Sequence, residues 1–252
     1  MSRAATEFRY EKLTWPEIND AVDLRKVCIV PCGAVEQHGP HLPLDVDMVC
    51  PTGIAKGAGA IIPDKLLVLP TVCYGYTGHV MDFPGTINNH YTHFIEHVLD
   101  ITKSLAYHGF KKILLLNGHG SNMPNLDLVA RRTNLATDAE CILAAWWNLL
   151  TVDKAFLPRW RESKFPGGCA HACELETSLY LFLDGGNVWS DAWDFNVSEL
   201  RYDAGPGLRY NTPIGPLRVD LGYQLNPIPG LMVNGEEQSR RFRFHFSFGQ
   251  AF

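Results

Sequence analysis

A dense group of possible metal ligands lies between residues 36 and 47. The segment reads Glu-Gln-His-Gly-Pro-His-Leu-Pro-Leu-Asp-Val-Asp and includes Glu36, His38 and Asp47. Carboxylate oxygen combined with imidazole nitrogen suits zinc, manganese or iron, and a bridging carboxylate allows two ions to share a site. The alternative is a solvated loop in which Asp45 or Asp47 caps the following helix. Because caps do not explain Glu36 and His38 together, we favour the metal site.

A second candidate ligand, His119, lies in the segment Asn-Gly-His-Gly-Ser-Asn, directly after the most apolar predicted strand. Gly118 and Gly120 would let the backbone turn sharply and present the imidazole at the edge of a sheet. The alternative is a loop histidine that is hydrogen-bonded to Asn117 or Asn122. The segment lacks the third glycine of a dinucleotide-binding loop, and a nucleophile elbow would need serine where His119 stands.

A third candidate ligand, Glu176, lies where a glycine-rich loop runs into an apolar helix. A carboxylate near the start of a helix is favoured by the helix dipole and can point back into a site. Glu174 cannot share that helical face, so we expect it to contact solvent or a neighbouring group as a cap or salt-bridge partner. A separate zinc site of Cys169, His171 and Cys173 is an alternative, but it lacks the usual second ligand pair.

Three further residues, His79, Trp146 and Ser121, are candidates for substrate contact. His79 precedes a Phe-Pro-Gly segment and either lines a pocket or lies on the surface. Trp146 and Trp147 follow a predicted strand, so they form either an aromatic wall of the site or part of the core. Ser121, two residues after His119, is the third candidate.

The elements that must position these residues alternate between strand and helix. Short apolar runs suited to buried strands lie at 27–31, 66–72, 112–116 and 141–146. Segments predicted as helices lie at 48–57, 91–108, 122–133 and 174–183. This alternation predicts an α/β protein, a three-layer α/β/α sandwich with a mostly parallel central sheet. Ligands of such sheets bind at the carboxyl ends of the strands, where the motifs above fall.

The composition is that of a globular protein. Hydrophobic residues make up 46% of the 252 residues and charged residues 19%, which excludes disordered, collagen-like and coiled-coil classes. We predict a single domain over residues 1–252. The net charge of -5 and the absence of long basic runs argue against nucleic acid as a partner.

Localisation signals are absent from the sequence. No stretch has the apolar length of a membrane helix, and residues 1–12 lack the apolar core of a secretory signal. Seven cysteines, an odd number, lie mostly in apolar stretches and predict buried, reduced thiols. We therefore expect a cytoplasmic protein without structural disulfides and without a membrane partner.

The sequence changes character after residue 185, where glycine and proline become frequent and helical periodicity disappears. Residues 185–252 are therefore predicted to be a loop-rich C-terminal part with short strands. Phenylalanines at 242, 244, 246 and 248 alternate with polar residues such as Arg243 and His245. That alternation predicts a half-buried strand, which would suit an interface.

The motifs follow one another in a specific order: Glu36-Gln-His38-Gly-Pro-His-Leu-Pro-Leu-x-x-Asp47, Phe83-Pro-Gly-Thr86, Asn117-Gly-His119-Gly-x-Asn122 and His171-Ala-x-x-x-Glu176-Thr-Ser178. This combination, over roughly residues 25–185, resembles the creatininase (creatinine amidohydrolase) family. The resemblance implies an α/β/α fold, a two-metal site and hydrolysis of a small cyclic amide or formamide, usually in a homohexamer. By position it implies a set of metal ligands, with Asp47 as the bridge and His171 as the proton-transfer residue; the ligands are Glu36, His38, Asp47, His119 and Glu176.

Two departures from the pattern bear on the substrate. Creatininase proper carries a metal-binding glutamate where this chain has Ser121, and a substrate-covering tryptophan near residues 165–168. Other branches of the family resemble this chain better at the small residues Gly120-Ser121. These branches include deformylases of pyrimidine intermediates, cofactor-peptide processing enzymes and hydrolases of keto-inositols. We therefore predict a metal-dependent hydrolase that opens or deformylates a small polar substrate, expected to be cyclic, through a metal-activated water. The alternatives are a C–C bond hydrolase of a cyclic keto-sugar and a non-catalytic metal-binding protein.

Overall fold

The computed structural model describes residues 2–163 and 170–184, together with the strand segments 203–204, 207–212, 215–224, 232–233, 236–237 and 242–248. The chain divides into two compact units, Met1–Tyr180 and Leu181–Phe252. The candidate site residues all belong to the first unit. That the whole chain forms one domain stays a prediction.

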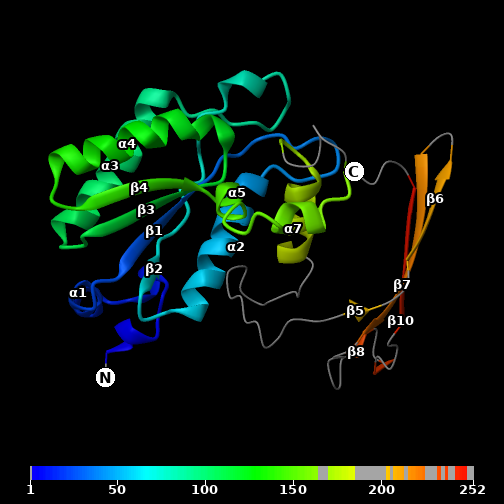
Figure 1. Cartoon of the computed structure of the whole chain (residues 1–252), viewed down its shortest axis with the longest axis horizontal. Helices are drawn as coiled ribbons and strands as arrows, with labels where there is room; N and C mark the ends of the chain where they lie inside the picture. Colours follow the sequence, from blue (N-terminus) through cyan, green and yellow to red (C-terminus); the bar gives the residue numbers. More distant parts are fainter. Residues whose placement is uncertain are drawn as a thin grey trace. The chain divides into compact units, whose positions relative to one another are not determined.

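A four-stranded parallel sheet is the centre of the first unit, with the strand order β2-β1-β3-β4 (Figure 1). The strands are β1 (Val27–Cys32), β2 (Leu66–Val68), β3 (Lys112–Asn117) and β4 (Glu140–Ala145). All four predicted strands are present. Strand β2 is shorter than predicted because Pro70 has no N–H group for the ladder, although Val72 still forms an isolated parallel bridge with Cys32.

Helices α1 (Trp15–Asp23), α3 (Tyr91–Tyr107) and α4 (Met123–Ala136) contribute to the first of two hydrophobic clusters. Strand residues with the same parity point to this face, among them Cys28, Val30 and Leu115. Phe94, Val98 and Leu105 of α3 enter the same cluster. These apolar residues therefore form the buried face of this helix.

The opposite face of the sheet packs against α2 (Val46–Ile61), α5 (Trp146–Leu149) and α7 (Glu174–Asp184). Ile29, Leu114 and Leu116 point to this second cluster, which also contains Trp146 and Leu175. Helices on both faces of a parallel sheet make a three-layer α/β/α arrangement (Figure 1). The predicted fold class is confirmed.

Several element boundaries differ from the prediction for local reasons. Helix α2 begins at Val46, so Asp47 lies in its first turn and not in the preceding loop. Trp146 begins helix α5 and does not end strand β4, which corrects the predicted strand 141–146. Helix α1 was not predicted, although Thr14 and Glu17 form a capping box with Pro16 at the first turn.

Short helical turns complete the first unit: η1 (Arg3–Ala5), η2 (Tyr10–Lys12), η3 (Gly78–Val80), η4 (Gly120–Asn122) and α6 (Phe156–Trp160). Among the described residues, no helix is both long and apolar enough to cross a membrane. Free thiols are found at all described cysteines, namely Cys28, Cys32, Cys50, Cys73, Cys141 and Cys173.

The described residues of the second unit are the end of α7 and a set of antiparallel strands: β5 (Asp203–Ala204), β6 (Gly207–Thr212), β7 (Gly215–Gln224), β8 (Met232–Val233), β9 (Glu236–Glu237) and β10 (Phe242–Phe248). Strand β7 pairs with β10, β5 and β6, and β8 pairs with β9. The alternating segment 242–248 is thus a strand, as predicted. Several of the glycines and prolines behind the loop prediction, such as Pro206, Pro213 and Pro227, lie outside the described residues.

Candidate metal centre

The predicted ligands follow the carboxyl ends of the central strands or begin helices beside them. Glu36 and His38 come shortly after β1, and Asp47 lies in the first turn of α2. His119 comes two residues after β3, and Glu176 lies in the first turn of α7. Parallel strands bring their carboxyl ends to one edge, which explains why segments so distant in sequence meet.

Two glycines allow these segments to approach the backbone of Asp47. A Cβ atom at Gly33 would lie 2.6 Å from the carbonyl oxygen of Asp47, and one at Gly118 would lie 2.1 Å from the same atom. Real Cβ atoms do not approach other atoms so closely. The glycine before His119 is therefore required for close packing, which is a stronger reason than the sharp turn that the sequence suggested.

Glu36, Asp47 and His119 form a first ligand group, in which one ligand atom of each lies within 4.8 Å of the others. The Nδ1 atom of His119 is 2.9 Å from Oδ2 of Asp47, and its Nε2 atom is 3.1 Å from Oε2 of Glu36. All three side chains are buried. This group contains three of the five predicted ligands.

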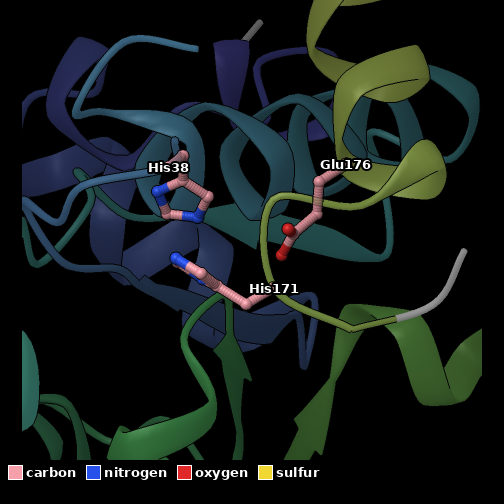
Figure 2. A group of neighbouring side chains, drawn as sticks. All are labelled: His38, His171 and Glu176. Carbon is pink, nitrogen blue, oxygen red and sulfur yellow. The ribbon is translucent and has the colours of Figure 1, made fainter. Parts of the chain in front are cut away.

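His38, His171 and Glu176 form a second ligand group with the same spacing (Figure 2). Asp47 connects the two groups, because its Oδ1 atom is 3.2 Å from Nε2 of His38 while its Oδ2 atom faces His119. A carboxylate with one oxygen toward each group would be able to bridge two ions. His171, predicted as a proton-transfer residue, lies close enough to be a ligand as well.

The donor set fits divalent metal. Neither Nε2 of His38 nor Oδ2 of Asp47 has a hydrogen-bond partner within the described part of the chain, although both are buried. Nε2 of His38 lies 3.2 Å from Oδ1 of Asp47, and Oδ2 of Asp47 lies 2.9 Å from Nδ1 of His119, but neither contact has the geometry of a hydrogen bond. Buried polar atoms without partners destabilise a fold, whereas ligand atoms converging on a cation have this arrangement. Imidazole nitrogen with carboxylate oxygen suits zinc or manganese.

The electrostatics of the cluster also favour a cation. Burial opposes protonation of His38, but its contact with Asp47 outweighs this effect and raises the pKa of His38 to about 9. Burial also raises the pKa of Glu176 to about 7, opposed by His38 and reinforced by the negative charge of Asp47. For Asp47, burial favours the neutral acid, yet contacts with His119 and His38 hold its pKa below the ordinary value. Positive charge on the histidines thus stabilises the carboxylates, a role that a metal ion would take over.

Glu36 is oriented by residues around it. Thr77, which is fully buried, donates a short hydrogen bond from its hydroxyl to Oε2 of Glu36. The backbone N–H of Thr77 in turn donates to Oδ1 of Asn88 at 2.9 Å. Neither Thr77 nor Asn88 was predicted from the sequence, although Thr77 lies two residues before the candidate residue His79. Such supporting contacts commonly orient metal ligands.

Gln37 fixes the orientation of His171. The backbone N–H of Gly39 donates to Oε1 of Gln37 at 3.0 Å, so the amide nitrogen of Gln37 must face the other way. That nitrogen lies 3.0 Å from Nε2 of His171 and donates to it. The imidazole proton is then on Nδ1, which faces Oε1 of Glu36 at 3.5 Å.

A cavity of about 700 Å³ opens beside the ligand groups. All three predicted substrate contacts, His79, Ser121 and Trp146, line it. The Oγ atom of Ser121 is 3.4 Å from Nδ1 of His79, and the His79 ring stacks on that of His119 with centroids 6.1 Å apart. Trp146 is both core and cavity wall: it is 2% exposed, and among the described residues its indole nitrogen has no hydrogen-bond partner. Asn148 and Thr151 also line the cavity and were not predicted.

The remaining candidates have other contacts. The carboxylate of Glu174 accepts the backbone N–H groups of Glu162 and Ser163, each at 2.9 Å, so it contacts a neighbouring segment. His119 does exchange backbone hydrogen bonds with the side chain of Asn117, but its imidazole faces Asp47 and Glu36. Cys169, required for the alternative zinc site, and residues 165–168 lie outside the described residues.

Comparison with known sequences gives consistent matches. A family model described as Creatininase: Creatinine amidohydrolase matches residues 11–219. Creatinine amidohydrolase of Pseudomonas putida is 32% identical over 185 residues, which cover 68% of this chain and 70% of that protein. The mycofactocin precursor peptide peptidase of Mycobacterium tuberculosis (strain CDC 1551 / Oshkosh) is 30% identical over 173 residues, covering 66% of this chain and 61% of that protein. The 3-dehydro-scyllo-inosose hydrolase of Thermotoga maritima is 26% identical over 175 residues, covering 69% of this chain and 55% of that protein.

Solved structures agree with the sequence matches. A crystal structure of creatinine amidohydrolase (creatininase) superposes with a TM-score of 0.62 at 26% identity, covering 77% of this chain and 84% of that chain. A structure described as Creatininase Mn also has a TM-score of 0.62 at 26% identity, covering 77% of this chain and 85% of that chain. The family model spans most of the chain, and the fold agrees with it. The chain therefore belongs to the creatininase family.

Proposed function

We propose that this creatininase-family hydrolase uses two divalent metal ions to hydrolyse a small polar substrate, cyclic by the family resemblance, at an amide or formamide bond. One observation carries the proposal: two ligand groups share the carboxylate of Asp47 beside a cavity. The printed names of relatives add support, since one is a creatinine amidohydrolase and one structural neighbour is described as a Zn-Zn type creatininase.

The residues divide into two sets of ligands. Glu36, Asp47 and His119 would hold one ion, while His38, Asp47 and Glu176 would hold the other, with zinc, manganese or iron as candidates. Divalent metal in such a site polarises a carbonyl group and lowers the pKa of a coordinated water from about 15.7 to about 7. Three buried carboxylates in one cluster supply the negative charge that two cations require.

His171 is the proposed proton-transfer residue. Its side chain is 43% exposed, so it reaches the cavity while its Nδ1 atom faces Glu36. Burial and the neighbouring His38 lower its pKa, which favours the neutral ring. To accept a proton at Nε2 and pass it to the leaving nitrogen, the neutral ring would give up the hydrogen bond that Nε2 accepts from Gln37. Gln37 holds the ring in place through Nε2.

The cavity would bind the substrate between an aromatic wall and a polar rim. Trp146 and Trp147 both line the cavity and form the wall, with ring centroids 5.8 Å apart. His79 and Ser121 form part of the rim. Ser121 is small and neutral where creatininase proper has a metal-binding glutamate, which is why we propose a substrate other than creatinine.

The test is a substrate screen with the zinc-loaded and manganese-loaded protein. The screen contains creatinine, formamidopyrimidines, cyclic imides and keto-inositols, with released amine, formate and open-chain acid measured separately. We expect turnover of an amide or formamide, and a decrease of at least ~10²-fold in His171→Ala with metal content unchanged. Turnover that is equal in the metal-free protein, or unchanged in His171→Ala, would contradict the proposed roles.

A C–C hydrolase of a cyclic keto-sugar is the second candidate, favoured by the match to the 3-dehydro-scyllo-inosose hydrolase. Release of an open-chain acid from a keto-inositol, without amine or formate, would identify it. A non-catalytic metal-binding protein would turn over none of these compounds. Assembly as a homo-oligomer, a hexamer by resemblance, and a cytoplasmic location stay predictions.

A further inference from the structure

Within the described residues, three hydrogen-bonded side-chain pairs join the loop of residues 36–47 to the segment of residues 171–180, in addition to the contact of Glu36 with His171. We call these pairs the loop–helix clasp. They are Gln37 with His171 at 3.0 Å, His41 with Thr177 at 3.2 Å, and Asp45 with Tyr180 at 3.0 Å. In each pair the first residue belongs to the loop that carries Glu36 and His38, and the second belongs to or directly precedes α7, which carries Glu176.

Of the three pairs in the loop–helix clasp, the pair of Tyr180 and Asp45 is the least exposed to water. Tyr180 is 6% exposed and Asp45 is half-buried, whereas His41 and His171 are exposed. The hydroxyl of Tyr180 donates to Oδ1 of Asp45. A hydrogen bond to a charged acceptor that water reaches poorly is stronger than an exposed neutral one.

The positions of these two residues connect the bond to the candidate metal site. Tyr180 follows Glu176 by four residues on α7, so both side chains lie on the same face of the helix. Asp45 is the N-cap residue of α2 and precedes Asp47 by two residues. The bond therefore joins the two helices that present Glu176 and Asp47, whose like charges repel each other.

Apolar packing is one of the contacts that position α7. Leu175 and Leu179 contact the second hydrophobic cluster, but such contacts are non-directional and tolerate small rotations. A hydrogen bond has a direction and a narrow distance range. We propose that Tyr180 is a positioning residue: its bond to Asp45 holds α7 in the rotation that places Glu176 opposite His38. This inference rests on the proposed function, because it requires Glu176 to be a metal ligand.

The experiment is a zinc titration of the metal-free, full-length protein against a chromophoric chelator. The variants are Tyr180→Phe, Asp45→Ala and the double variant. Tyr10→Phe is the matched control, because Tyr10 packs against Phe110 outside the ligand groups. We expect the wild type to bind two zinc ions, and Tyr180→Phe to bind one ion as before and the other at least ~10-fold more weakly, as is typical of lost supporting contacts. The double variant should bind no more weakly than Asp45→Ala, and Tyr10→Phe should match the wild type.

Different failures have different meanings. Equal binding of both ions by the wild type and Tyr180→Phe would overturn this inference and leave the proposed function intact. Losses that simply add in the double variant would also overturn it, since the two residues would then act separately. A wild type that binds no zinc would overturn the proposed function and this inference together. Should Tyr180→Phe not fold, Asp45→Asn, which keeps an acceptor oxygen, should bind zinc more tightly than Asp45→Ala, and equal weakening would refute the bond's role.

Discussion

Asp47 is the residue on which both halves of the candidate site depend. Its two carboxylate oxygens face different histidines, His119 at 2.9 Å and His38 at 3.2 Å. Each histidine belongs to a different ligand group, and each comes from a different segment of the chain. Loss of this carboxylate would therefore affect both ions, whereas loss of Glu176 would affect one.

The side-chain amide of Gln37 donates a hydrogen bond to Nε2 of His171, and we predict that this bond sets the tautomer of His171. In the metal-free wild type, two-bond nitrogen–proton NMR correlations at mildly alkaline pH should show the His171 proton on Nδ1. Gln37→Met removes the donor to Nε2, so the proton should move at least partly to Nε2.

His79, which lines the cavity but faces Ser121, provides an internal control in the same spectrum. Its tautomer should be unchanged by Gln37→Met. A His171 spectrum that is identical in the wild type and the variant would show that Gln37 does not orient this ring.

At the scale of elements, the site depends on how closely the ends of β1 and β3 approach the start of α2. Gly33 follows β1 and Gly118 follows β3, and both lie against the carbonyl group of Asp47. Gly120, in the same loop as Gly118, has no atom within 4 Å of the position where its Cβ would lie. The two glycines of one motif therefore have different roles.

This difference gives a matched pair of variants. Gly118→Ala should lower the free energy of unfolding by about 1–3 kcal/mol or more, because the new methyl group overlaps the carbonyl oxygen of Asp47 and the ring of Pro51 in α2. Gly120→Ala should change it by less than about 0.5 kcal/mol, as for surface substitutions without special contacts. Urea denaturation of the metal-free proteins measures both, and equal stability of the two variants would contradict the close packing.

The sequence predicted the elements better than the contacts between them. Apolar runs and helical periodicity located all four strands of the sheet and helices α2, α3, α4 and α7, because these patterns are local. Boundaries shifted where one residue decides them, as Pro70 does for β2. Helix α1 was missed although its capping signal, Thr14 with Glu17, is present in the sequence.

In the candidate site too, the sequence predicted the residues better than the contacts between them. The ligand candidates were visible as residue types with unusual spacing, and the structure brings all five of them and His171 together. Thr77 and Tyr180 were not visible, since a threonine or tyrosine hydroxyl has no sequence signal for the distant carboxylate that it will meet. Gln37 lies inside the first motif, yet its role depends on a residue 134 positions away.

At the scale of the whole molecule, the candidate ligands span residues 36 to 176 and come together only in the folded first unit. A ligand that binds the folded state and not the unfolded one stabilises the fold, by about 2.7 kcal/mol when its concentration is 100 times its dissociation constant. Metal content, folding stability and the geometry around Asp47 are therefore linked.

The central claim is that these side chains hold divalent metal, and metal analysis tests it most directly. Protein purified without added metal and then incubated with excess zinc should retain up to two ions per chain by mass spectrometry after desalting, and should unfold at a higher temperature than the chelator-treated protein. Asp47→Asn should retain fewer ions, because both groups lose charge at once. A wild type that retains no metal, or an Asp47→Asn variant that retains as much as the wild type, would contradict the account.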